Sequence, residues 1–246
     1  MKFIALAVSL LLSAVVGFDA SAVVGSGSSV YGVMRITSSE SEVIVAVPFN
    51  SADDSAINVS NLVLTANLTV GDDLYYYNGT DFDAWKLAEG ADGVKYWQSV
   101  GQVDKTQVKT SENPTTATLS RGRSLIIRRE KTSSPIYLIG IVPTGTASTT
   151  IAANTKALVA PPFTGTDTKT TIDLNADVTW SGVDAKDILW VPSSGSSLKQ
   201  YKYKNGQWKA GFSTAAATVP AGQGFWYESK GGAPTITWAA PSPAAD

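Results

Sequence analysis

The sequence contains neither cysteine nor histidine, and these two absences exclude most kinds of catalytic and metal chemistry. Such a chain cannot build a Ser-His-Asp or Cys-His nucleophile, an imidazole ligand set or a thiolate zinc site. It cannot form disulfides either. We therefore predict a protein that is not an enzyme, with no catalytic residues, no metal site and no cofactor.

Charge is also scarce, since charged residues make up 16% of the chain and the formal net charge is −2. Average proteins have about 25% charged residues. There is no basic stripe, so nucleic acid is not an expected partner. No basic amphipathic helix or lipid-attachment cysteine is present, so no membrane anchor is expected. A surface rich in Ser, Thr, Gly and Ala is instead poorly defended against edge-to-edge pairing of strands.

The carboxylates that remain occur as short local pairs in turn-like contexts, at Asp53-Asp54, Asp72-Asp73 and Asp81-Phe82-Asp83. An Asp in a turn usually bonds its own backbone, so we predict turn and capping roles. None of the pairs has the spacing of an EF-hand loop. A weak calcium site and a pair of glycosidase acids stay open as alternatives.

The first 22 residues predict export. Lys2 is followed by an apolar run that reaches Val16, and the segment ends in Ala20-Ser21-Ala22. This is the pattern of a secretory signal peptide, which we expect to be cleaved after Ala22. The alternative is a buried first strand or helix of the fold. We expect a secreted or cell-surface protein, and the absence of cysteine favours a bacterial one.

Short runs of β-branched and aromatic residues, bounded by turn formers, dominate the rest of the chain and predict an all-β fold. They lie at 30–36, 43–47, 74–77, 124–127, 136–139, 188–191, 225–227 and 235–238. Asn78-Gly79 and Asn205-Gly206 are signals for type I′ hairpin turns. A short helix is expected only near 55–64.

An internal repeat is the most informative pattern, because five blocks recur in one order. The matched blocks are 43–49 with 157–163, 73–76 with 187–190, Trp85 with Trp208, 119–127 with 219–227, and 135–138 with 234–237. We predict two tandem, internally duplicated domains, each a β-sandwich or a small β-barrel. The expected division is signal peptide 1–22, N-terminal arm or strand 23–42, first domain 43–142, linker 143–155, second domain 156–240 and flexible tail 241–246.

Four aromatic residues are the candidate contacts for a ligand or a subunit: Trp190, Tyr201, Tyr203 and Trp208. Exposed rings in a row bind sugars, but rings also fill the cores of β-proteins. Tyr201 and Tyr203 alternate with Lys202 and Lys204, so the two tyrosines are expected on one face of a strand.

Gly32-Val33, the run Val45-Ala46-Val47-Pro48-Phe49 and the run 220–227 (PAGQGFWY) resemble motifs of a group of secreted proteins. The group consists of uncharacterised two-repeat β-proteins from verrucomicrobia-like bacteria. The resemblance implies an exported two-repeat β-protein and no particular activity.

Two functions fit these observations. The first is an extracellular structural protein that self-associates into a surface layer, filament or other homo-oligomer, with strand addition by the arm at Val23 to Ile36 as one route. The second is a carbohydrate-binding or adhesive module, with a glycan held by the exposed aromatic residues.

Overall fold

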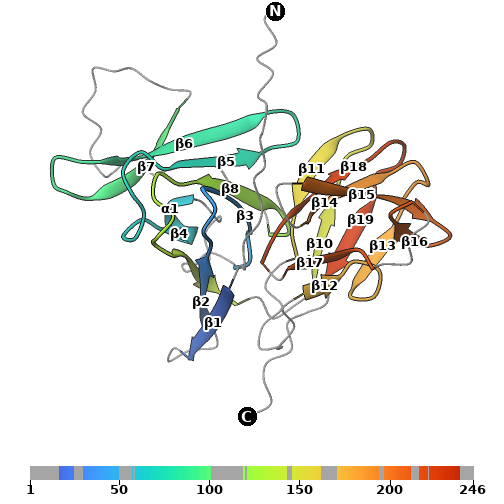
Figure 1. Cartoon of the computed structure of the whole chain (residues 1–246), viewed down its shortest axis with the longest axis horizontal. Helices are drawn as coiled ribbons and strands as arrows, with labels where there is room; N and C mark the ends of the chain where they lie inside the picture. The colour runs from blue at the N-terminus through green and yellow to red at the C-terminus, as the bar shows by residue number, and fades with distance from the viewer. Residues whose placement is uncertain are drawn as a thin grey trace, which may run out of the picture.

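The computed structural model describes residues 17–24, 30–49, 57, 59–100, 119, 121–142, 146–161, 171–193, 197–211, 216–220 and 222–238. These residues form five sheets in which every strand pairing is antiparallel, so the predicted all-β class is confirmed. The single helix of the described chain, α1 (Val59–Leu62), lies within the region where a short helix is predicted. Figure 1 shows two groups of strands side by side, which we call the first half (17–142) and the second half (146–238).

The first half contains two sheets whose buried side chains belong to one hydrophobic core. The larger sheet has the order β3 (Glu42–Ala46), β8 (Ser124–Arg128), β5 (Asp73–Tyr77), β6 (Phe82–Glu89) and β7 (Lys95–Ser99). The smaller has the order β1 (Gly17–Val24), β2 (Val30–Thr37), β9 (Ile136–Ile141) and β4 (Val63–Leu64). Alternate residues of both sheets fill the core, among them Ile36, Leu74 and Ile127, each completely buried.

The described part of the second half also has a five-stranded larger sheet, but its smaller sheet has three strands instead of four. Its larger sheet has the order β11 (Lys156–Val159), β18 (Phe225–Glu228), β14 (Ile188–Ser193), β15 (Ser197–Lys204) and β16 (Gln207–Lys209). The smaller sheet has the order β10 (Ala147–Thr150), β19 (Thr235–Trp238) and β13 (Val178–Ser181). A further pair joins β12 (Thr171–Asp173) to β17 (Thr218–Pro220). A separate hydrophobic core lies between these sheets and includes Leu189, Trp208 and Tyr227.

Strand order and register define which residues of the two halves are equivalent. In the first half Ile127 lies opposite both Val43 and Leu74. In the second half Tyr227 lies opposite both Ala157 and Leu189. Val43 is therefore equivalent to Ala157, as the first sequence block predicts, and Leu74 is equivalent to Leu189.

Three of the other block matches need correction, among them 135–138 with 234–237, where Ile136 corresponds to Ile236 rather than to Thr235. Trp85 lies opposite Leu74, and Tyr201 lies opposite Leu189, so Trp85 is equivalent to Tyr201. The equivalent of Trp208 is Trp97. Trp97 lies opposite Leu87, two residues after Trp85, and Trp208 lies opposite Tyr203, two residues after Tyr201. The block at 73–76 is likewise displaced by one residue relative to 187–190. The turns are the cause of the mismatch, since the hairpin at Asn78 joins β5 to β6, whereas the hairpin at Asn205 joins β15 to β16.

Only one of the two expected type I′ turns is present. Asn205 and Gly206 both have positive φ, 51° and 78°, and they form the two-residue connection between β15 and β16. The connection after β5 instead covers 78–81, where Asn78 Oδ1 accepts hydrogen bonds from the N–H groups of Thr80 and Asp81. Asn78 therefore acts through its side chain rather than through a left-handed backbone.

The segment predicted as N-terminal arm or strand contains β2, and the segment predicted as linker contains β10. β2 pairs with β9 along Tyr31 to Ile36, and Ile36 is fully buried in the first core. β10 lies within the predicted linker 143–155, and Ala147 and Ile151 belong to the second core. The exposed residues of β10 are Ser and Thr, and this polar face makes the strand resemble a linker in the sequence.

Candidate functional site

The two halves meet at a junction whose contacts occur in equivalent pairs. Val45 forms a β-bridge with Gln223, and the equivalent pair, Val159 and Arg123, forms another. Ala46 N–H donates to Gly222 O over 2.8 Å. In the equivalent contact, Ala160 N–H donates to Gly122 O over 3.0 Å. Exchanging the halves therefore reproduces the same contacts, as in an isologous dimer interface.

Four strands meet at this junction. β3 pairs with β8 and β11 pairs with β18, and the two bridges connect these pairs into a closed ring of backbone contacts. The side chains between them form a third hydrophobic cluster, with Ile44 and the equivalent Leu158 both fully buried. This cluster contains residues of both halves, so it holds them together as a sheet-to-sheet contact would.

Aromatic rings extend the cluster at one side of the junction. Trp226, from the second half, lies with its ring centroid 5.3 Å from Tyr77 and 6.1 Å from Phe82, both of the first half. These edge-to-face arrangements are the ones that aromatic pairs prefer. Ile126 occupies the position equivalent to Trp226, so the junction is symmetric in its backbone and asymmetric in its ring content.

Gly224 and its equivalent, Ser124, face each other at the junction. A Cβ atom on Gly224 would clash with Ser124 Oγ and would lie 2.8 Å from Ile44 Cγ2. Ser124 Oγ is buried and has no hydrogen-bond partner in the described part of the chain. The halves approach so closely here that only one of the two positions has room for a side chain.

Each half also contains one buried aspartate in an equivalent place. Asp72 Oδ2 accepts from Thr69 N–H (2.9 Å), and its Oδ1 accepts from Glu130 N–H (2.7 Å). Asp187 makes the same two contacts, with the N–H groups of Asp184 (3.0 Å) and Lys230 (2.7 Å). Both carboxylates are at most 1% exposed.

The second half adds a side-chain donor to this arrangement. Tyr227 Oη donates to Asp187 Oδ2 over 2.6 Å, where the first half has Ile127. Burial and this hydrogen bond to Asp187 raise the pKa of the Tyr227 hydroxyl far above its usual range. A carboxylate whose oxygens are occupied by backbone donors fastens a turn to a strand.

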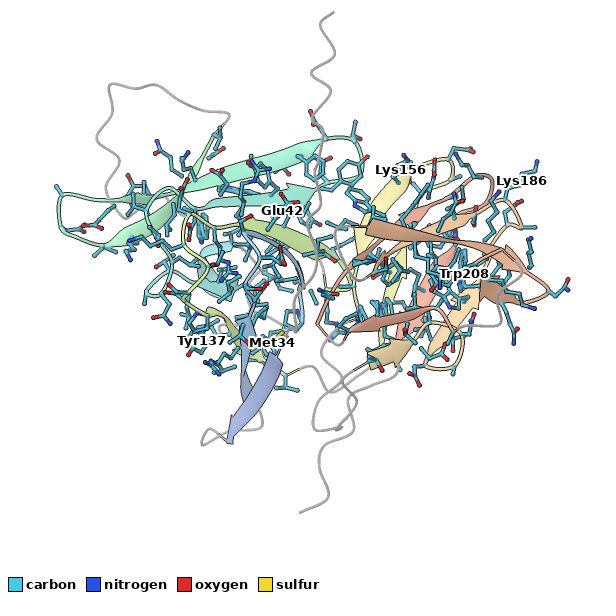
Figure 2. All side chains as sticks on the ribbon, viewed as in Figure 1. Met34, Glu42, Tyr137, Lys156, Lys186 and Trp208 are labelled. Carbon is cyan, nitrogen blue, oxygen red and sulfur yellow. The ribbon has the colours of Figure 1, made fainter. Side chains whose placement is uncertain are left out.

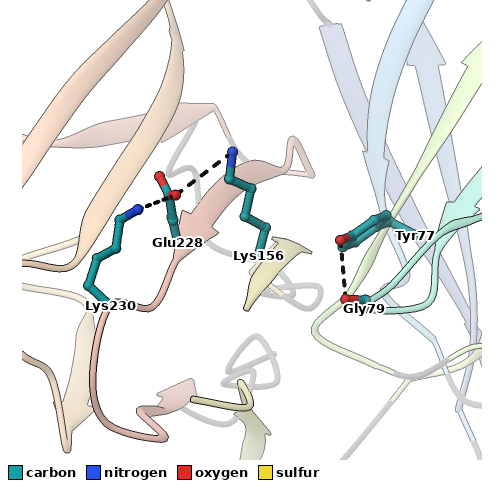
Figure 3. A network of polar contacts seen from close by, with 5 residues as sticks. All are labelled: Tyr77, Gly79, Lys156, Glu228 and Lys230. Atoms are coloured by element: carbon teal, nitrogen blue, oxygen red, sulfur yellow. Dashed lines mark hydrogen bonds and ion pairs between the residues drawn. The ribbon is translucent and has the colours of Figure 1, made fainter. Parts of the chain in front are cut away.

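Near the junction, the second half carries a cluster of charged residues on the surface of its larger sheet. Glu228 contacts Lys156 (3.8 Å) and Lys230, and Figure 3 shows this network beside Tyr77, whose hydroxyl donates to Gly79 O. Burial raises the pKa of Glu228, but the hydrogen bond from Lys230 and the charge of Lys156 outweigh it. The pKa of Glu228 therefore lies below its ordinary value.

The four aromatic residues predicted as contacts do not form one exposed row. Tyr201 and Trp208 are 4% and 1% exposed and belong to the second core, and Trp208 is labelled in Figure 2. Tyr203 packs against that core, with its ring 5.1 Å from Trp208. Trp190 lies on the opposite face of the sheet, where its indole hydrogen-bonds Glu228. The alternation of the two tyrosines with exposed Lys202 and Lys204 is as predicted.

The acidic pairs have varied positions. Asp72 is the buried cap of the first half, and Asp73 forms an ion pair with Lys86. Asp81 and Asp83 belong to the hairpin after β5, and Asp53-Asp54 lies outside the described residues.

The described ranges contain no group of three or more residues arranged to hold a metal ion. In the same ranges, no helix is long and apolar enough to cross a membrane.

Sequence reasoning misses Trp226, Trp97 and the role of Asp187. Trp226 stands in a recognisable strand motif, but a period-2 pattern cannot distinguish a junction face from a solvent face. A signal for Asp187 is present, because Asp72 and Asp187 each precede an apolar strand. The block match hides it, since that match aligns Asp187 with the neighbouring Asp73.

Comparison of the whole chain with protein-family models, with curated proteins and with solved structures finds no match.

Proposed function

We propose that this chain is an exported, non-catalytic structural subunit that self-associates, and that its two halves are duplicated β-sandwiches. The observation that carries the proposal is the junction, where equivalent residues of the halves contact each other reciprocally. Reciprocal contacts of this kind are those of an isologous interface between two identical partners, so they support an origin of the junction in such an interface. Under this proposal, pairing with a copy is a property of the fold.

Several other features support a structural role. The larger sheets of both halves end in edge strands, and charged residues that deter strand pairing are scarce along the chain. Buried carboxylates serve as caps, and the absence of histidine and cysteine excludes cysteine nucleophiles and serine nucleophiles activated by histidine. The predicted signal peptide and the resemblance to exported bacterial proteins support a location outside the cell.

The carbohydrate-binding alternative loses its main support. It requires a planar row of exposed rings, and two of the four candidate residues lie in the core of the second half. The remaining two, Trp190 and Tyr203, are on opposite faces of one sheet. A glycan partner therefore has no support in this geometry.

The proposal is tested on the mature protein recovered from the exported fraction. We expect N-terminal sequencing to begin at Val23, and light scattering with electron microscopy to detect oligomers whose size grows with concentration. A protein that stays monomeric up to millimolar concentration would contradict self-association. A protein retained in the cell with its first 22 residues intact would contradict export.

A further inference from the structure

The outer edge of β2 is covered by a strand that export is predicted to remove. All eight residues of β1 pair with β2, from Gly17 opposite Thr37 to Val24 opposite Val30. The predicted cleavage after Ala22 removes every residue of β1 except Val23 and Val24. Processing would thus leave the backbone groups of 32–37 on the outer side of β2 without their strand partner.

The equivalent edge of the second half is β10, and equivalence follows from the strands beside it. Ile136 follows Ile127 at the same distance along the chain as Ile236 follows Tyr227, the equivalent of Ile127. Ile36 is opposite Ile136, and Thr149 is opposite Ile236, so β2 and β10 correspond. No strand pairs with the outer side of β10 within the part of the chain that the structure describes.

The outward-pointing groups of β10 can be identified from one contact. Ile151 N–H donates to Pro234 O (2.9 Å), in line with the β10–β19 ladder. Hydrogen-bonded pairs alternate along an antiparallel ladder, so Thr149 and Ala147 direct their backbone groups toward β19. Thr146, Ser148 and Thr150 therefore direct theirs to the outer side.

Two arginines of the first half cap this outer side. Arg121 Nη2 donates to Thr146 O over 3.2 Å, and Arg123 Nη2 donates to Thr150 O over 3.4 Å. Because two of its outward carbonyl groups already accept hydrogen bonds from these charged arginines, the β10 edge is a poor template for another strand. The residues equivalent to these arginines in the second half are Ala221 and Gln223, which carry no charge.

We propose that removal of the signal peptide opens the β2 edge, and that this edge then pairs with the β2 edge of a second copy of the chain. This inference rests on the proposed function and specifies where self-association begins. Two copies of one strand related by a two-fold axis are antiparallel, which is the arrangement of every pairing in the described part of this molecule. β2 carries one charged residue, Arg35, so its edge lacks the charges that usually prevent such pairing.

The absence of cysteine allows a direct test, because any introduced thiol is the only one in the chain. Single cysteines are placed at Val33, Arg35 and Thr37 on β2, and at the equivalent Thr146, Ser148 and Thr150 on β10. Each mature variant, alone and mixed in pairs from the same edge, is oxidised and run on a non-reducing gel. Strands paired across an interface bring some residues within the roughly 4.4–6.8 Å Cα separation that a disulfide needs.

We expect a disulfide-linked dimer from at least one β2 variant or β2 mixture, and monomer from all β10 variants. We also expect a chain that begins at Gly17, and so retains β1, to lose most of the dimer formed by the chain that begins at Val23. Equal cross-linking at both edges, or an unchanged dimer when β1 is retained, would overturn the β2 assignment while leaving self-association intact. A mature chain that is monomeric by light scattering as well would refute the proposed function itself.

Discussion

The two halves keep the same strand register while they exchange the signs of their charges. In the first half Glu42 lies opposite Arg128, with a shortest N–O distance of 3.3 Å. In the second half the same two positions are Lys156 and Glu228, 3.8 Å apart. Figure 2 labels Glu42 and Lys156 on the two larger sheets. Both cross-strand pairs have complementary charges, and the backbone register does not depend on which strand carries the acid.

The halves differ more in how they hold the buried aspartate. Asp72 has two backbone donors, whereas Asp187 has the equivalent two and the Tyr227 hydroxyl. The second core is also richer in tyrosine, since Tyr201 and Tyr203 replace Trp85 and Leu87. We infer that the second half depends more strongly on its buried carboxylate than the first.

The largest expected effect is the loss of these carboxylates. Asp187→Ala leaves the buried Tyr227 hydroxyl and two part-buried backbone N–H donors without an acceptor, and should destabilise the protein by about 3–5 kcal/mol. Asp72→Ala leaves two such donors and should cost about 2–3 kcal/mol. Urea denaturation of both variants measures the difference. Tyr227→Phe serves as the control, and an equal loss for the two alanine variants would contradict a distinct role for Tyr227.

The second effect concerns the close approach of Gly224 and Ser124. Gly224→Ser forces a side chain against Ser124 Oγ and Ile44, and should destabilise the protein by about 1–3 kcal/mol. Adding Ser124→Gly exchanges the equivalent residues and should recover at least half of that loss. The recovery is measured as the coupling free energy of a double-mutant cycle. Additive effects would show that the two positions do not meet.

The smallest effect is that of the exchanged ion pair, and it depends on pH. The folded pKa of Glu228 lies below its ordinary value, so its contribution is present above the unfolded value, about 4.3. That contribution is lost as the pH falls through the folded pKa. Glu228→Gln should therefore cost about 0.5 kcal/mol near pH 7, since the partner lysines are half exposed, and nothing well below pH 4. Thermal unfolding at the two pH values tests this, and a pH-independent difference would contradict it.

Much of the fold can be predicted from local pattern. The strands around Val43, Ile126, Leu189 and Tyr227 are identifiable because β-branched and aromatic runs between turn formers have few other solutions. Strand β10 and the packing of β2 into the first core are harder to recognise. Their burial depends on β9 and β19, which lie far away in the chain.

The candidate site is less predictable than the fold. An alternating strand has two faces, and the sequence does not say which face meets solvent, core or another sheet. The pattern therefore predicts Trp208 and Tyr201 as contacts, although they lie in a core. Trp226 lies between the halves, although its strand motif gives no sign of that position.

The sequence by itself determined the all-β class, the scarcity of charge and the exclusion of histidine and cysteine chemistry, because these follow from composition and from short-range periodicity. Only the tertiary structure decided that Trp97 is the equivalent of Trp208 and Asp72 the equivalent of Asp187, because register across strands fixes those matches. It also decided that Val45 meets Gln223 as Arg123 meets Val159. Such contacts depend on how two sheets approach each other, and no local pattern in the chain records that approach.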